Sequence, residues 1–232
     1  MSKGLTLPGA ALTTGCAMLL QTLTAPFAQF YVLERLIFPG DMERTVHNIV
    51  EHHTLFAAGL VALLVNYVLD IVIAWSLYVL LAAVNRQMSL LAAWFSLVYT
   101  ALGMVSALNL ATVFRLLTTP DYAIAFGARP LEAQAKLLLN TFRSDWSLGL
   151  IFFAIHLGLV GYLIWRSGFI PRIIGVLLIM NGLAWIVDGL EPYLYPNVNL
   201  PFLSIAYLGE LVLMGWLLIR GSKIQEDPTG KP

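Results

Sequence analysis

The chain has 232 residues, of which 59% are hydrophobic and only 11% are charged. The 13 basic and 13 acidic residues balance, and no basic run offers a surface for phosphates, so we expect no nucleic-acid partner. A mean hydropathy of +0.81 exceeds what a soluble domain can bury. The composition therefore predicts an all-α, polytopic membrane protein, and the single cysteine, Cys16, rules out an intrachain disulfide framework.

Six apolar runs are long enough for a helix to cross a hydrocarbon core of about 30 Å, which takes about 20 residues. They cover residues 7–32, 55–83, 90–117, 148–165, 171–188 and 202–219. We predict a single transmembrane domain, residues 1–232, built as a bundle of six helices. The first run is long and lacks a small-residue cleavage site, so we expect it to be a helix and not a cleaved signal.

The connection between the third and fourth runs is itself predicted to be helical. In residues 128–147, Leu131, Ala135, Leu138 and Phe142 fall on one face of a helix. This pattern predicts an interfacial helix on the outer side of the membrane that runs straight into the fourth span.

Basic residues set the expected orientation. Arg86, Arg166 and Arg172 lie in short connections, and Arg220 and Lys223 follow the last apolar run. Because basic residues favour the cytoplasmic side, we predict that both termini are cytoplasmic and that the two longer connections lie outside.

Ionisable or amide side chains lie near the middle of four different spans. Each is within about two residues of a midpoint, or about 3 Å along a helix axis. They are Asp70, His156, Asn181 and Glu210. A charged side chain at the bilayer centre costs roughly 2.5 to 3.5 kcal/mol on insertion scales, so such residues face the bundle interior and often mark a site. We expect these side chains to face one another or a small hydrated cavity.

Our preferred interpretation is a central polar cavity that binds a small amphipathic or proton-linked ligand, for transport or sensing. Asp70 and Glu210 would exchange protons, and His156 would be their switchable partner. The amides that would orient the ligand are Asn66, which is one helical turn from Asp70, Asn109 and Asn181.

Two alternatives remain open. In the first, the protein is an intramembrane enzyme in which Asp70 or Glu210, with His156 as a further catalytic candidate, donates a proton to a lipid-soluble substrate such as an isoprenoid, as a cyclase or isomerase does. In the second, it is an accessory subunit whose buried polar residues fix the helix register. No lysine lies inside a span and only His156 lies at membrane depth, which excludes a retinal Schiff base and a haem held by two histidines. We expect no cofactor, and membrane lipid as the general partner.

A polar run before the second span offers the other candidate site. His47 and Glu51, at i and i+4, would share a helical face, and His52 and His53 follow them. A solvated collar at the membrane surface explains this run more simply than a metal site does. We therefore expect no metal there.

Several stretches of the chain resemble a known family. They are GLIFFAIHLGLVGYLIWRSGFIPRIIGVLLIMNGLAWIVD from Gly149, GELVLMGWLL from Gly209, PGDMERTVHNIVEHHTLF and LDIVIAWSLYVLLAAVNR. Together they are similar to the bacterial membrane proteins grouped as domain of unknown function 4386. The resemblance implies six helices in the bacterial inner membrane, with no assigned activity or cofactor. The positions that match its pattern most closely are Asn48, Asp70, Asn85, His156, Arg172 and Glu210, whereas the histidines of the collar and Asn181 depart from it.

Overall fold

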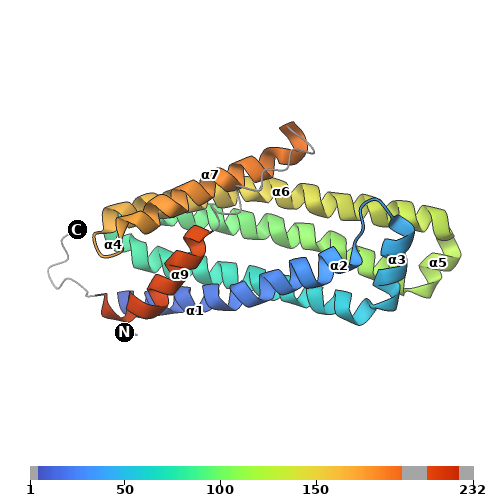
Figure 1. Ribbon diagram of the computed structural model, residues 1–232, viewed down its shortest axis with the longest axis horizontal. Helices are drawn as coiled ribbons and strands as arrows, with labels where there is room; N and C mark the ends of the chain where they lie inside the picture. The colour runs from blue at the N-terminus through green and yellow to red at the C-terminus, as the bar shows by residue number, and fades with distance from the viewer. Residues whose placement is uncertain (1–4, 195–207, 225–232) are drawn as a thin grey trace. The chain divides into compact units, whose positions relative to one another are not determined.

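The structure is a computed structural model that describes residues 5–194 and 208–224. All regular elements in this part of the chain are helical, which confirms the predicted all-α class (Figure 1). The helices are α1 (Leu7–Pro26), the π-helix η1 (Phe27–Leu33), α2 (Glu34–Leu36), α3 (Met42–Glu51), α4 (His53–Thr118), α5 (Pro120–Phe126), α6 (Ala128–Ser167), α7 (Arg172–Leu194), α9 (Leu208–Arg220) and the 3₁₀ turn η2 (Gly221–Lys223).

The chain divides into two compact units that share α1, α4 and α6. Unit 1 comprises Met1–Leu20, Leu69–Ala101 and Ser147–Pro232, and unit 2 comprises Gln21–Val68 and Leu102–Trp146. Each unit has its own cluster of buried apolar side chains.

Within the described residues, four helical stretches are long and apolar enough to cross a membrane. They are Leu7–Leu36, His53–Thr118, Ala128–Ser167 and Arg172–Leu190. Large apolar side chains on these stretches remain exposed, including Leu23 at 65% and Leu108 at 64%. Such exposure is compatible with contact with lipid.

The α4 helix is a hairpin and not a single rod. Its 66 residues would extend about 100 Å at 1.5 Å per residue, three times the thickness of a hydrocarbon core. The backbone leaves the helical region at one residue, Asn85, where φ is −157° and ψ is 105°. In unit 2 the two arms meet again, because a side chain at Gly103 would collide with the ring of Tyr67.

Asn85 also begins the second arm of α4. Its side-chain Oδ1 accepts a hydrogen bond from the backbone amide of Met88 at 3.0 Å, which is how asparagine caps the start of a helix. Ser89 Oγ donates to the carbonyl of Tyr78 at 3.0 Å across the turn. The predicted short connection between the second and third runs is therefore this single capped break.

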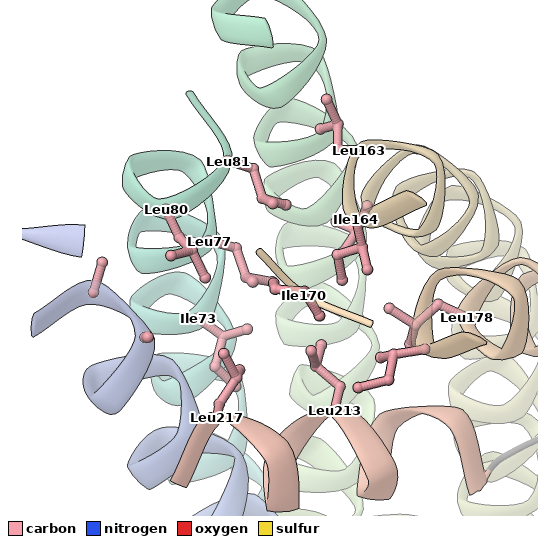
Figure 2. Close-up of a cluster of buried hydrophobic side chains, with 14 of the residues drawn as sticks. Ile73, Leu77, Leu80, Leu81, Leu163, Ile164, Ile170, Leu178, Leu213 and Leu217 are labelled. Carbon is pink, nitrogen blue, oxygen red and sulfur yellow. The ribbon is translucent and has the colours of Figure 1, made fainter. Parts of the chain in front are cut away.

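The core of unit 1 is formed where α4, α6, α7 and α9 meet. Figure 2 shows Ile73, Leu77 and Leu80 of α4 near Leu213 and Leu217 of α9. Leu80 and Leu217 have no exposed surface, so this cluster is fully dry. It packs α9 against α4 and α7.

Glycines bring α6 and α7 into backbone contact. They recur at every seventh position, at Gly161, Gly168, Gly175, Gly182 and Gly189. Gly168, with φ of +73°, forms the turn between the two helices. A β-carbon added to any of the other four would lie 2.5 to 2.8 Å from a backbone oxygen of the facing helix. Only glycine permits this approach.

Unit 2 is built around the N-terminal half of α6. Leu131, Ala135 and Phe142, from the predicted apolar face, are buried in its core, and Leu138 packs against it. Residues 128–147 are helical and continue without a break into the apolar half of α6. The prediction that this connecting helix runs straight into the fourth span is thus confirmed.

The remaining predicted runs match helices with shifted ends. The first run corresponds to α1, η1 and α2, in which Pro26 lacks an amide hydrogen and the chain continues as a π-helix. The fifth run, apart from Pro171, lies within α7. The sixth run begins at residue 202, and its residues 202–207 lie outside the described part of the chain, whereas the rest belongs to α9.

Candidate functional site

Two of the predicted midspan residues contact each other in unit 1. Asn181 on α7 has no exposed surface, and its Nδ2 donates a hydrogen bond to Glu210 Oε1 on α9 at 2.7 Å. Trp185, one turn further along α7, directs its Nε1 toward the same oxygen at 3.5 Å. Glu210 Oε1 therefore accepts from two donors of one helix, and we name these three residues the Glu210 cluster.

A close approach of the helix backbones places Glu210 beside Asn181. Gly209 is buried on α9, and a β-carbon there would lie 2.8 Å from the carbonyl oxygen of Leu177. Because glycine lets α9 touch α7 at this point, the short glutamate side chain reaches the facing amide. The Glu210 side chain itself is partly buried.

The second polar atom of the Asn181 amide is the most unusual feature of the cluster. In the hydrogen bond to Glu210 the amide nitrogen is the donor, so the amide oxygen points away from the carboxyl group. Within the described residues, this Oδ1 is buried and has no hydrogen-bond partner. Leaving a buried acceptor unpaired costs about 1 to 3 kcal/mol, which a bound donor group would remove.

His156 is buried in unit 1, with 3% exposure, but its hydrogen bond goes to the main chain. Its Nδ1 lies 2.8 Å from the carbonyl oxygen of Ala92 on α4. Because that oxygen can only accept, Nδ1 carries a proton. Glu210 accepts from Asn181 and Trp185, so the predicted partnership of His156 with Glu210 is not a direct one.

An aromatic side chain stands between His156 and the Glu210 cluster. Phe153 stacks on the imidazole of His156 with ring centroids 6.0 Å apart. On its other side it meets the indole of Trp185 edge to face at 6.1 Å. His156 and Glu210 thus belong to one continuous chain of side-chain contacts within unit 1.

Asp70 and Asn66 lie one turn apart on α4, and the structure assigns them to different units. Asp70 belongs to unit 1 and is buried, with 7% exposure. Asn66 belongs to unit 2, where its carbonyl oxygen accepts from Gln21 Nε2 at 3.1 Å and its Oδ1 from Thr24 at 3.5 Å. Their predicted role in one ligand site with the Glu210 cluster stays a prediction.

Asn109 in unit 2 has an acidic partner that the sequence did not suggest. Its Nδ2 donates to Asp145 Oδ2 on α6 at 3.2 Å. Asp145 lies three residues before the predicted start of the fourth span, so the apolar runs place it in a connection between spans. The continuous helical pattern through that connection was the signal that could have placed it opposite Asn109. Trp185 was also missed, although it lies one turn from Asn181.

The ionisable side chains of the polar collar are exposed. His47 Nε2 and Glu51 Oε2 are 3.2 Å apart, as their spacing predicts, but their side chains are 75% and 57% exposed. His52 ends α3, and His53 Nδ1 lies 3.2 Å from the carbonyl oxygen of Val50. Among the described residues, no group of three or more possible ligands gathers here or elsewhere.

The helices and the buried polar contacts define an α-helical protein with several stretches able to cross a membrane. The chain belongs to the family described as domain of unknown function (DUF4386), which it matches over residues 13–221.

The chain is also similar to an archaeal protein. An uncharacterised protein of Archaeoglobus fulgidus is 30% identical to the chain over 191 residues, which cover 82% of this chain and 94% of the relative. No solved structure matches the chain.

Proposed function

We propose that this chain is a six-span membrane protein that binds a small amphipathic ligand at the Glu210 cluster, for transport or sensing. The observation that supports this proposal is the buried Asn181 Oδ1, which has no partner among the described residues. Membrane bundles usually satisfy their buried polar groups between helices. A buried acceptor beside a carboxylate is the arrangement expected when a ligand supplies the missing donor.

The chemistry of the cluster favours a ligand that carries a hydroxyl or ammonium group. Asn181 Oδ1 is an acceptor, and the second oxygen of Glu210 takes part in neither hydrogen bond of the cluster. A donor group bridging these two oxygens would satisfy both. The neighbouring rings of Trp185 and Phe153 would contact its apolar part. A cationic donor would favour ionised Glu210, so binding would be coupled to release of a proton.

The proposed topology has both termini on one side of the membrane. In unit 1 a β-carbon at Gly221, just after α9, would lie 2.9 Å from the β-carbon of Ala11 near the start of α1. Arg172 at the start of α7 and Arg220 at the end of α9 line one shallow hollow with Trp216. These ends therefore lie together, as expected if α9 is the last part of a sixth span and the basic ends face the cytoplasm.

Analysis of retained ligands tests the binding proposal. The full chain is purified in a mild detergent, and native mass spectrometry and a solvent extract are compared for the wild type, Asn181→Leu and the control Asn48→Leu. We expect Asn181→Leu to lose at least about tenfold of the retained ligand, because one charge-assisted or buried hydrogen bond is lost. The thermal stability of Asn181→Leu should not fall by more than that of Asn48→Leu, because the substitution also removes the buried amide oxygen that has no hydrogen-bond partner among the described residues. Equal retention by Asn181→Leu and the wild type contradicts the proposal, and a chemically altered compound in the extract indicates an enzyme.

The pH dependence of retention tests the role of Glu210. A donor or cationic ligand favours the ionised carboxylate, so retention by the wild type should fall as the pH is lowered. In Glu210→Gln, retention should be weaker and independent of pH, because the amide still accepts from Asn181 but does not titrate. The same pH profile in both proteins would exclude Glu210 as the linked group.

A further inference from the structure

Unit 2 contains a hollow of about 260 Å³ that shares no residue with the Glu210 cluster. One wall is the N-terminal half of α6, and the other is the chain from the end of η1 through α2 to the start of α3. Its deepest lining is apolar, because Leu33, Leu139 and Phe142 are buried, with 5 to 8% exposure. The hollow thus has an apolar floor.

The rim of this hollow carries charges of both signs. Lys136 and Arg143 project from α6, seven residues or about 10.5 Å apart along the helix. Glu34 of α2 lines the opposite wall. Within the described part of the chain, none of these three forms an ion pair, and all are exposed. These oppositely charged side chains line one small hollow but do not pair. There is therefore room for a ligand between them.

The hollow lies at the level where apolar helix gives way to polar chain. Glu34 is near the end of the apolar stretch Leu7–Leu36, and Lys136 precedes the apolar half of α6. In a membrane, this transition coincides with the headgroup region. A molecule bound here would therefore have its polar head at the rim and its chain over the floor.

We propose that this hollow binds a zwitterionic amphiphile with a phosphate and a primary ammonium group. The phosphate would accept from Lys136 and Arg143, and the ammonium would donate to Glu34. A quaternary ammonium has no hydrogen to donate and would fit less well. Pockets for drug-sized ligands measure about 300 to 1,000 Å³, so the hollow would hold a headgroup and the start of its chain, not a whole lipid.

Competition between short-chain lipids tests this proposal. The full chain is stripped of lipid in a nonionic detergent, and binding of dihexanoyl phosphatidylethanolamine is followed by native mass spectrometry. We expect this lipid to bind about tenfold more tightly than dihexanoyl phosphatidylglycerol, which lacks the ammonium, and than dihexanoyl phosphatidylcholine, which cannot donate.

Charge-removing variants assign the binding to the rim. Lys136→Gln combined with Arg143→Gln should weaken phosphatidylethanolamine binding by at least about tenfold, because the phosphate loses both cations. Glu34→Gln should remove the preference over phosphatidylglycerol. Arg129→Gln on α6 and Glu43→Gln on α3 alter exposed charges outside the hollow and should change nothing. All five side chains are exposed, so each variant should fold, which circular dichroism verifies.

Three results would overturn the proposal. Unchanged binding in the double variant excludes the hollow as the site. Equal affinity for phosphatidylglycerol, with no effect of Glu34→Gln, assigns the hollow to anionic lipids and removes the ammonium contact. If soluble phosphoethanolamine competes as strongly as the lipid does, the hollow is a site for a free zwitterion, and the apolar floor has no role in binding.

Discussion

Two buried polar side chains in unit 1, those of His156 and Asn181, differ in whether their hydrogen bonding is complete. His156 must carry a proton on Nδ1 to bond the carbonyl oxygen of Ala92, and Asn181 uses only its nitrogen within the described residues. The hydrogen bonding of His156 is complete without a ligand, whereas that of Asn181 is not. We therefore propose that the ligand binds at Asn181 and that His156 has a positioning role beside Phe153.

The tautomer of His156 can be measured directly. In the chain labelled with ¹⁵N-histidine, we expect the buried imidazole to show the Nδ1–H tautomer, because only a donor can face a carbonyl oxygen. His156→Asn, whose amide nitrogen can replace Nδ1, should be more stable than His156→Leu by about 1 kcal/mol, the net value of a typical hydrogen bond. A Nε2–H tautomer, or equal stabilities of the two variants, would contradict the assigned geometry.

The sequence located these residues but not their partners. Depth along a span is set by the apolar runs, so the level of Asn181 and Glu210 could be predicted from residue numbers alone. The rotation of each helix about its axis is set by packing, and it directs Glu210 to Asn181 and His156 to a backbone oxygen. Because a main-chain acceptor exists at every residue, no motif could single out Ala92.

The glycine series is the main determinant of packing at the scale of helices. Gly161 and Gly175 face each other's backbone, and Gly182 and Gly189 face Ala154 and Ser147 in the same way. This spacing of seven residues keeps one face of each helix against the other. The repeat is visible in the sequence. It spans a turn and two predicted helices, so it does not stand out within either predicted span alone.

A single added methyl group tests this contact. In Gly182→Ala, the β-carbon would lie 2.7 Å from the carbonyl oxygen of Ala154, a rigid backbone atom, so the helices must separate. We expect a loss of about 1 to 3 kcal/mol in unfolding free energy, measured by denaturant titration in micelles. The matched control is Gly158→Ala on α6, where no atom lies within 4 Å of the added carbon. That variant should be as stable as the wild type or up to about 1 kcal/mol more stable. Equal effects of both substitutions would exclude tight backbone contact at Gly182.

For the whole molecule, the lengths of the apolar runs predicted which residues are helical better than they predicted where one helix ends and the next begins. The second and third runs proved to be two arms of α4 joined at Asn85, since capping by one asparagine side chain needs no loop. The connecting helix was correctly joined to the fourth run because its apolar face continues in phase. Neither the division into two units nor the hollow in unit 2 could be read from the sequence, as both depend on contacts between distant segments.

Labelling of introduced cysteines tests the proposed six spans. In a Cys16→Ala background, single cysteines at Arg129 and Ser222 are treated with a charged maleimide in right-side-out and inverted vesicles. Three spans are expected between these positions, so Arg129→Cys should react only from outside and Ser222→Cys only from inside. Reaction of both from the same side would mean that α9 does not complete a span.

The glycine contacts between α6 and α7 also restrict how the protein can move. Each glycine fits opposite one particular oxygen, and the next equivalent fit lies a full repeat away, about 10.5 Å along the axis. Small sliding of these two helices past each other would drive side chains into backbone. If ligand uptake requires a rearrangement, α6 and α7 should move as one rigid body, and the displacement should be sought in α9, whose Glu210 accepts a hydrogen bond from Asn181 of the proposed site.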